Sequence, residues 1–428
     1  MNKLLKLRDF GKVKMCKRIL KEQTSTKEEI PFFKISTFGD KADTFISKTI
    51  FESYKVKYPY PRKGDILISA AGTLGKTVIY NGEDHYYQDS NIVWLEHKED
   101  IVLNRYLYYF YKTSPWVSTN GSTILRLYND NILDIKISVP DLHTQQKIAA
   151  VLSALDDKIE LNNKINAELE AMAKILYDYW FVQFDFPNEE GKPYKSSGGK
   201  MVYNPILKRE IPEGWEVKKI KDIAKTGSGG TPKSTVSDYY EEGIIPWINS
   251  GEVNNPFIIN TKNYISQLGL QNSSAKIFPA YTLLMAMYGA TAGKVSVLSF
   301  EASTNQAICA VMPYDKNMFF YTKFVLEDMY KYLVSLSSGS ARDNLSQDKI
   351  KDLNIVTPEL DVLNYFMKNV EGIYNKIENN LKQNHELAQL RDWLLPMLMN
   401  GQVKVEDTYS SNEPQTNIAA EAAKAYQN

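Results

Sequence analysis

The sequence predicts an α+β protein: two pseudo-repeated, mostly-β units, each followed by a long helix, with the two helices packing as an antiparallel coiled coil. Three observations lead to this prediction. A chain of 428 residues is long enough for two or three domains. Its motifs recur once at a constant spacing, and an apolar pattern typical of a coiled coil follows each copy.

The internal repeat is clearest at the end of each copy. Gly, Ser, Ile, Asp and Pro of the segment 121–140 fall in register with those of 339–358 at an offset of 218 residues. The same offset continues beyond the repeat, where Lys158-Ile-Glu160 matches Lys376-Ile-Glu378. A period this long excludes a solenoid and indicates two copies of one globular unit.

Each unit is expected to be mostly β. Short apolar segments bounded by Gly, Asn, Asp or Ser are typical of strands, and they lie at 65–69, 77–80, 91–95, 283–287, 295–298 and 307–312. Short helices are expected between strands, at 103–113 and 319–335.

The long helices are predicted from apolar residues that step by four, three and four positions. The first helix has this pattern at Ile148, Leu152, Leu155 and Ile159, and the second at Phe366, Val370, Ile373 and Ile377. Such an alternation forms a coiled-coil seam. The first helix is expected to span roughly 40 residues, or about 60 Å.

Asparagines interrupt both seams at the same offset. They are Asn162 and Asn166 in the first helix and Asn380 and Asn384 in the second. A buried Asn in a seam lowers stability but fixes the register of the two helices. Pro396 is expected to end the second helix, because proline cannot continue the helical hydrogen bonds.

These patterns divide the chain into six segments. They are a first β unit at 1–141, a helix at 142–185, a linker without a core at 186–202, a second β unit at 203–358, a helix at 359–401 and a disordered tail at 402–428.

Composition excludes several classes of protein. No run of 18 apolar residues exists, so no membrane-spanning helix is expected. Cys16 and Cys309 are too few for a disulfide framework or a zinc cluster, which fits a reducing cytoplasm. Lys plus Arg equals Asp plus Glu at 51 each, but residues 1–140 carry about six more basic than acidic residues, which makes the first β unit the basic one.

The sequence matches two catalytic motifs only in part. Gly72–Thr77 matches the end of a phosphate-binding loop, but Ala70 replaces the first glycine of that motif. Asp141 and Asp156 imitate the carboxylate pair of a metal-dependent nuclease, yet the second copy does not keep these acids. The four histidines have no metal-ligand spacing, and no metal site is expected.

The repeated motifs taken together closely resemble the target recognition domains of type I restriction–modification specificity subunits. They include Pro212-Glu-Gly-Trp215, Gly229-Gly-Thr-Pro232, Ser303-Thr-Asn305-Gln and Gly339-Ser-Ala-Arg342. The segment 139–159 is similar to the start of that family's central helix, and the resemblance covers about 400 of the 428 residues. Two features depart from the pattern: the first unit lacks a Gly-Trp opening, and Val362-Leu363 replaces Thr144-Gln145 in the second helix.

The resemblance implies a non-catalytic subunit that recognises DNA. Each β unit is expected to read one half of a bipartite, interrupted target in double-stranded DNA. The helices are expected to space the two readers and to bind two methyltransferase subunits, which carry S-adenosylmethionine and methylate adenine. Restriction and translocation subunits that use ATP and Mg²⁺ would join this complex, which defends a cell against foreign DNA. No cofactor is expected on this chain.

Polar residues near the glycine turns of each unit are predicted to contact DNA, because a glycine turn allows close approach. They are Ser69, Thr73, Lys76, Asn91 and Arg126 in the first unit, and Tyr288, Thr291, Lys294, Asn305, Arg342 and Asn344 in the second. The alternative is that the glycines only connect strands and that the asparagines cap turns.

Apolar residues outside the strict seam are predicted to bind a partner protein. They are Leu161, Ile165, Tyr177, Trp180 and Phe181. The alternative is that these side chains pack on the adjacent β units. Two other functions also remain open at this point: a coiled-coil scaffold with two protein-binding β modules, and a metal-dependent nuclease that uses Asp141 and Asp156.

Overall fold

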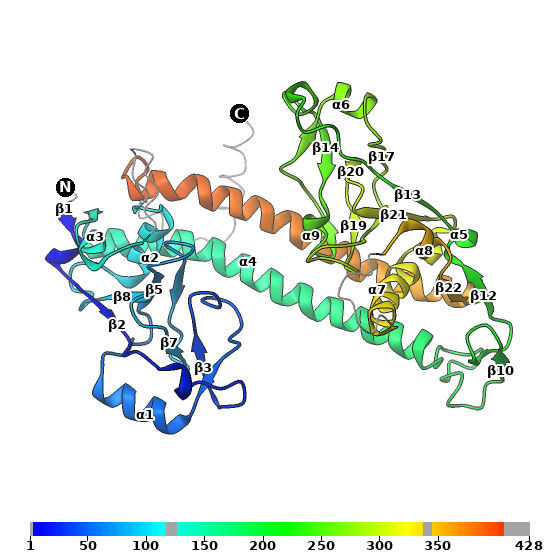
Figure 1. Ribbon diagram of the computed structural model, residues 1–428, viewed down its shortest axis with the longest axis horizontal. Coiled ribbons are helices and arrows are strands. Elements are labelled where there is room, and N and C mark those ends of the chain that lie inside the picture. Colours follow the sequence, from blue (N-terminus) through cyan, green and yellow to red (C-terminus); the bar gives the residue numbers. More distant parts are fainter. Residues whose placement is uncertain (1–2, 117–125, 337–344, 406–428) are drawn as a thin grey trace, which may run out of the picture. The chain divides into compact units, whose positions relative to one another are not determined.

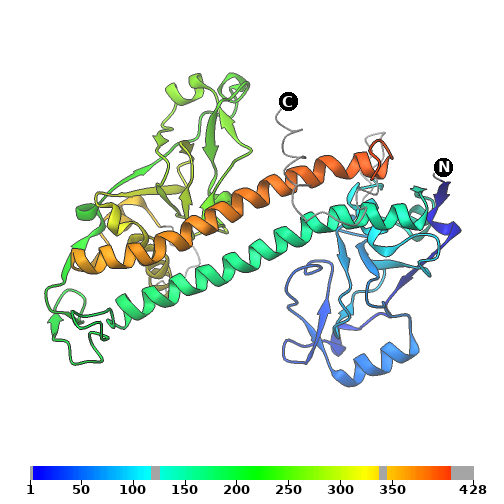
Figure 2. The ribbon, with the colours of Figure 1, turned by 180° about the vertical axis from the view of Figure 1, so that it is seen from behind.

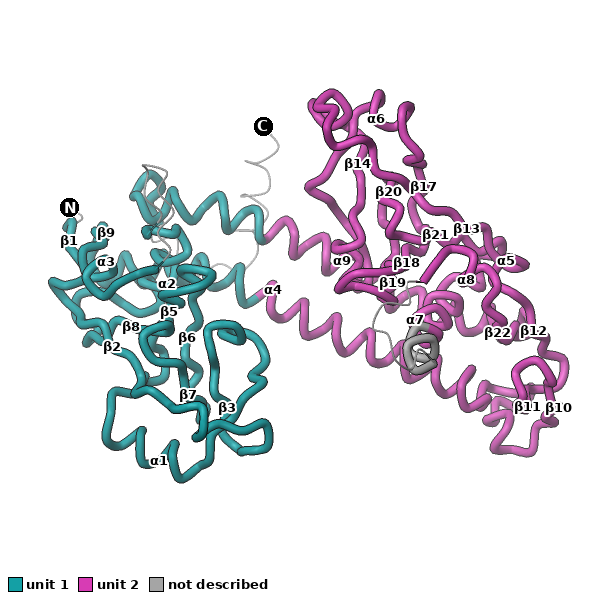
Figure 3. Tube along the Cα trace, in the orientation of Figure 1, with its two compact units in different colours: residues 1–157, 388–428 teal, residues 158–387 magenta. Residues whose placement is uncertain are grey.

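The computed structural model describes residues 3–116, 126–336 and 345–405 (Figure 1). The chain forms two compact units (Figure 3). Unit 1 consists of Met1–Asp157 and Ala388–Asn428, and unit 2 consists of Lys158–Leu387. The long helices α4 (Leu142–Tyr177) and α9 (Leu360–Met399) therefore contribute one segment each to both units.

Unit 1 contains two small sheets and a strand pair. The first sheet has the order β2 (Lys12–Met15), β8 (Ile92–Glu96), β5 (Ile66–Ser69) and β6 (Thr77–Ile79), all antiparallel. The second has the order β4 (Phe45–Ile46), β3 (Ile30–Phe33) and β7 (Tyr86–Tyr87), with β3 and β7 parallel. Strand β1 (Lys3–Lys6) pairs with β9 (Lys136–Val139).

The described part of this domain also contains three short helices: α1 (Lys48–Lys57), α2 (Asn104–Lys112) and α3 (Asn129–Leu133). Single 3-10 turns lie at Leu7–Asp9 and Lys21–Gln23.

Unit 2 repeats this arrangement. Its larger sheet has the order β13 (Ala224–Ser228), β21 (Ile308–Pro313), β18 (Leu283–Ala286), β19 (Val295–Leu298) and β15 (Phe257–Ile258). Its second sheet has the order β16 (Tyr264–Ile265), β14 (Ile245–Ile248), β20 (Ala302–Thr304) and β17 (Ile277–Phe278), with β14 and β20 parallel. Two further pairs are β12 (Glu216–Lys219) with β22 (Asn354–Thr357), and β10 (Met201–Asn204) with β11 (Arg209–Pro212).

The helices of unit 2 besides α4 and α9 are α5 (Ile220–Ile223), α6 (Gln267–Gln271), α7 (Phe319–Leu336) and α8 (Gln347–Lys351). A π-helical turn at Asp178–Val182 follows α4, and 3-10 turns lie at Ser237–Tyr239, Ser250–Glu252 and Lys316–Met318. The strands and short helices predicted from the sequence are confirmed within one or two residues at their ends.

Both long helices help to form the core of each unit. In unit 1, Leu152 of α4 and Leu398 of α9 are buried in one apolar cluster with Ile66 and Val93 of the first sheet. In unit 2, Tyr177 of α4 and Phe366 of α9 belong to one cluster with Met285 of β18. Full burial of such a side chain contributes roughly 1.5–3 kcal/mol, so each domain depends on both helices.

Two expectations about chain segments are wrong. Pro396 does not end the second helix: α9 continues to Met399, where Asn400 N donates to the Pro396 carbonyl at 3.0 Å and Leu398 and Met399 are buried in the core. The stretch 186–202 is not a linker without a core. Phe186 is buried and stacks on Trp215 with ring centroids 4.9 Å apart, so this end of the stretch belongs to the core of unit 2.

In unit 2, segments of α4 and α9 lie side by side (Figures 1 and 2), and asparagine side chains join them. Asn380 Nδ2 donates to Asn166 Oδ1 at 2.8 Å, and both side chains are buried. Asn162 Nδ2 donates to Asn384 Oδ1, also at 2.8 Å. Residue numbers rise along one helix as they fall along the other, so the segments are antiparallel. The prediction that asparagines lie in both seams is confirmed, and their pairing in the structure fixes one register because a shifted pair would leave buried amides without partners.

Asn380→Ala should destabilise unit 2 by about 1–3 kcal/mol, because it leaves the buried Asn166 carbonyl without its donor. Asn166→Leu with Asn380→Leu removes both polar groups and should restore or exceed the original stability. Urea denaturation followed by circular dichroism measures both effects. Asn379→Ala, at an exposed neighbouring position, is the control and should change nothing. A double variant as unstable as Asn380→Ala would contradict this account.

Candidate nucleic-acid interface

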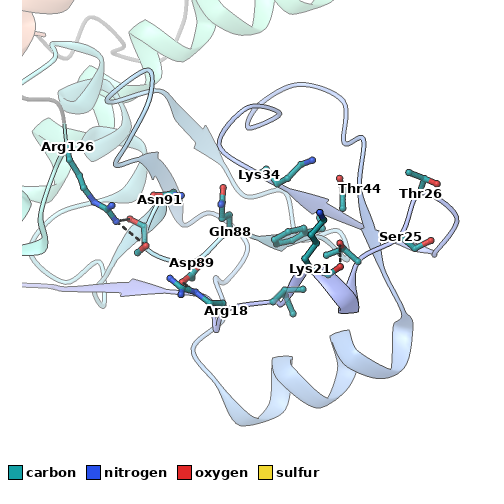
Figure 4. A pocket seen from close by; sticks show the side chains of 14 residues that line it. Arg18, Lys21, Ser25, Thr26, Lys34, Thr44, Gln88, Asp89, Asn91 and Arg126 are labelled. Atoms are coloured by element: carbon teal, nitrogen blue, oxygen red, sulfur yellow. Dashed lines mark hydrogen bonds and ion pairs between the residues drawn. The ribbon is translucent and has the colours of Figure 1, made fainter.

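Unit 1 has a basic cleft of about 680 Å³ (Figure 4). Its walls come from the loop after β2, the segment before β3, strand β3 itself and the loop between β7 and β8. Four of its lining residues are basic and one is acidic. The lining residues are Arg18, Ile19, Lys21, Thr24, Ser25, Thr26, Phe32, Lys34, Thr44, Gln88, Asp89, Ser90, Asn91 and Arg126.

Hydrogen bonds hold the two arginines of the cleft in place. Arg18 Nε donates to Asp89 Oδ2 at 2.7 Å. Arg126 Nη2 donates to the Ser90 hydroxyl at 3.1 Å, and its backbone forms a β-bridge with Ala71. A guanidinium carries five N–H donors in a planar fork, so each arginine keeps donors for a ligand. Such donors suit phosphate oxygens and the acceptor edges of bases.

Lys34 adds a further cation to the cleft. Its Nζ lies 2.9 Å from Asp43 Oδ1, and the side-chain hydrogen bond from Lys34 holds the pKa of that carboxyl below its ordinary value. Both groups are solvent-exposed, so this ion pair is screened and leaves the lysine free to exchange its partner.

The structure places the five predicted contact residues of unit 1 in two groups. Asn91 and Arg126 line the cleft. Thr73 and Lys76 are exposed on the turn between β5 and β6, outside the lining of the cleft. Ser69 is buried, and its hydroxyl donates to the Thr73 carbonyl and accepts from Lys76 N. Ser69 therefore stabilises the turn, and its hydroxyl already has two partners within the chain.

The glycines of this turn have a structural purpose. Gly75 has a positive φ of 77°, and a Cβ placed on it would lie 2.0 Å from the Trp116 ring. Unit 2 has the same turn: Gly293 also has φ 77°, and its N donates to the Ala286 carbonyl as Gly75 N donates to that of Ser69. The resemblance to a phosphate-binding loop therefore reflects a repeated strand connection.

In unit 2 the predicted residues lie in two places. Tyr288, Thr291 and Lys294 belong to the turn between β18 and β19, where the buried Thr291 donates to the Ser250 carbonyl at 2.6 Å and Lys294 is exposed. Asn305 follows β20 and donates from Nδ2 to Asn249 Oδ1 at 3.4 Å. Arg342 and Asn344 lie outside the described residues.

Sequence reasoning missed much of the cleft. Arg18, Lys21, Lys34, Gln88 and Asp89 line it, but none of them lies beside a glycine turn. The signal that could have found them is the excess of basic residues in the first 50 positions, which include strands β3 and β4 of the second sheet. The constant offset of 218 hides them, because the loops on this side of the two units differ in length.

The carboxylates of the nuclease alternative make structural contacts. Asp141 caps α4 by accepting from Thr144 N at 2.9 Å, and this bond holds its pKa below the ordinary value. Asp156 accepts from Arg391 at 2.7 Å and from Tyr109 at 2.9 Å. Among the described residues, no group of three or more His, Cys, Asp or Glu is placed to hold a metal ion.

The predicted partner-binding residues divide by burial. Tyr177, Trp180 and Phe181 belong to the core of unit 2, so the prediction that they are exposed is wrong: they pack on the β domain instead. Leu161 is 50% exposed, and Ile165 is half-buried on the same face of α4. Nor does any helix among the described residues have the length and apolar character needed to span a membrane.

Two copies of one recognition domain, the first with a basic cleft, define a class of two-domain DNA-binding proteins. Comparison with known families makes the assignment specific. Residues 2–171 and 212–387 match the type I restriction modification DNA specificity domain. The chain belongs to this family and contains two copies of its domain.

Individual relatives agree with this assignment. The chain is 55% identical over 170 residues to a putative type I restriction enzyme specificity subunit of Haemophilus influenzae, a match that spans 40% of this chain and only 43% of that relative. It is 30% identical over 358 residues to the type I restriction enzyme MjaIX specificity subunit of Methanocaldococcus jannaschii, covering 81% of this chain and 79% of the relative.

A solved structure has the same fold. The type I restriction-modification system S subunit from M. genitalium matches with a TM-score of 0.56 at 15% identity, over 93% of this chain and 96% of that one. The predicted fold class and the resemblance to specificity subunits are confirmed. Family membership favours neither a protein-binding scaffold nor a nuclease.

Proposed function

We propose that this chain directs a type I restriction–modification complex to a bipartite DNA target, and that it is not itself catalytic. The observation that supports this most directly is the presence of two DNA specificity domains in one chain. Each domain has its own sheets and its own polar loops, so each is able to read a separate stretch of DNA. The basic cleft of unit 1 supplies contacts to phosphates and bases together.

The two helices would set the distance between the readers. Both α4 and α9 run without a break across the boundary between the units, at Asp157 and at Leu387. An uninterrupted helix resists bending, so a pair of them suits a spacer. The stretch of DNA between the two half-sites would then be left unread.

The reactions of the complex belong to partner subunits. Two methyltransferase subunits would bring S-adenosylmethionine and methylate adenine, and restriction subunits would use ATP and Mg²⁺. The complex would act in the cytoplasm, where foreign DNA is met.

A stripe of apolar side chains on α4 is the surface that we assign to a methyltransferase subunit. Its residues step by three or four positions, so they lie on one face of the helix and of the π-helical turn that follows. Glu168 is the one charged residue in the series. The apolar members are Leu161, Ile165, Met172, Ile175, Tyr179 and Val182, and exposure reaches 57% at Met172 and 68% at Ile175. Exposed apolar patches of this kind mark protein interfaces.

The complex assembled with its methyltransferase subunits should select DNA with two conserved blocks separated by an unspecified gap of constant length. Sequencing the duplexes bound from a random library measures this. Arg126→Ala should relax one block only, because an arginine contact to a base discriminates by about 1–3 kcal/mol. A single continuous block would contradict the proposed function, as would an Arg126→Ala complex in which both blocks change.

Met172→Asp with Ile175→Asp should prevent binding of the methyltransferase subunit, since each aspartate would have to be desolvated in the interface. Copurification of the tagged chain with its partner measures this. The control is Ala167→Asp with Ala171→Asp, which adds the same charge at exposed positions of α4 outside the stripe. If the stripe variant copurifies as fully as the control, the assignment of this surface is wrong.

A further inference from the structure

The two units have equivalent backbone positions beside the parallel strands of their second sheets. In unit 1, β3 pairs with β7 in parallel, and Gln88 N donates to the Phe33 carbonyl at 2.9 Å. In unit 2, β14 pairs with β20 in the same way, and Asn305 N donates to the Ile248 carbonyl at 3.0 Å. Gln88 and Asn305 are therefore equivalent, and the next residues are Asp89 and Gln306.

A second pair of equivalent positions lies at the ends of β2 and β13, which are edge strands of the larger sheets. Met15 is the last residue of β2 and faces Val93, whereas Ser228 is the last residue of β13 and faces Cys309. In both units the next residue reaches the second sheet. Cys16 makes a hydrogen bond with the Tyr87 backbone, and a Cβ placed on Gly229 would lie 1.8 Å from the Thr304 carbonyl oxygen.

Two residues after Cys16 in unit 1, and after Gly229 in unit 2, a side chain bonds to the residue that follows Gln88 or Asn305. The side chains that form this bond differ between the units. In unit 1, Arg18 donates from Nε to Asp89 Oδ2 at 2.7 Å. In unit 2, Thr231 donates from its hydroxyl to Gln306 Oε1 at 2.5 Å. The backbone frame is thus the same, while a charged pair in one unit is replaced by a neutral pair in the other.

We propose that these two positions determine the base preference of each unit: Arg18, oriented by Asp89, reads a guanine, and Gln306, oriented by Thr231, reads an adenine. This inference rests on the proposed function. The two units have the same backbone at these positions but different exposed side chains. Two domains that recognise different DNA sequences require this combination. If each pair only joined two loops of its own unit, a charged pair in one unit and a neutral pair in the other would serve no purpose.

The free atoms of each pair match the proposed bases. The bond to Asp89 uses Nε of Arg18 and leaves both terminal nitrogens to donate to O6 and N7 of guanine. Arg18 is 67% exposed at its side chain and Asp89 only 19%, so the aspartate is the support and the arginine tip faces solvent. Gln306 is exposed, keeps both amide hydrogens and one lone pair of Oε1, and so has the donor and acceptor that adenine N7 and N6 require.

The test transfers the pair of unit 2 into unit 1. Arg18→Thr with Asp89→Gln leaves the net charge of the chain unchanged, so general attraction to phosphates stays the same. DNA selection with the assembled complex should show one guanine of one block replaced by adenine, with the other block intact. Arg18→Lys keeps the charge but loses the planar fork, and should lower the preference for that guanine about tenfold or more.

The matched control is Arg8→Thr with Asp134→Gln. Arg8 Nη2 lies 3.0 Å from Asp134 Oδ2, and neither residue lines the cleft. The control makes the same two substitutions in an ion pair elsewhere in unit 1 and should leave both blocks unchanged.

The outcomes separate the two proposals. A wild-type complex that selects no bipartite sequence overturns the proposed function itself. A wild-type complex that selects two blocks, together with transfer and Arg18→Lys variants that keep the original guanine, overturns this inference alone. Changes in both blocks, or a control variant that changes the same base, also overturn it. If the transfer variant fails to fold, Arg18→Lys decides the question by itself.

Discussion

Each β domain completes its apolar core with side chains from both long helices, and the rest of the structure follows from this. In unit 1 the helices supply Leu152 and Leu398, and in unit 2 they supply Tyr177 and Phe366. At roughly 1.5–3 kcal/mol for each large buried side chain, the helices are part of both domains. The core of each domain therefore includes its own helix segments.

Residues that pack with the helices or form turns are equivalent in the two units, whereas residues on exposed loops differ between them. Residues that face the core or form the glycine turn between β5 and β6 serve the fold, as Ser69 and Gly75 do. Side chains that point to solvent from the loops, as Arg18 does, are free to differ between the units. Recognition of two different sequences by one architecture needs this division.

Much of the fold could be predicted from the sequence because its signals are periodic or repeated. The spacing of the helix seams predicts where their asparagines lie, and in the structure these asparagines pair between the two helices. Exposure was harder to predict. Trp180 and Phe181 lie outside the seam in sequence, but the β domain covers them, and no local pattern shows which side of a helix a distant sheet will cover.

The site was harder still to predict, because its residues come from loops of unequal length. Arg18 is equivalent to Thr231 at an offset of 213, whereas Asp89 is equivalent to Gln306 at 217, and neither matches the offset of 218 between the segments 121–140 and 339–358. Only the strand registers bring these positions together. Composition shows that unit 1 is basic, but it does not show which cations share a cleft.

We propose that the helices space two independent readers. The most direct test inserts one heptad into each helix at the boundary of the units, after Asp157 and after Leu387. Seven residues keep the seam in phase and add about 10 Å, or about three base pairs. Selection of DNA by the assembled complex should give the same two blocks with a gap longer by about three base pairs. An unchanged gap at full binding, or altered bases in either block, would contradict the account.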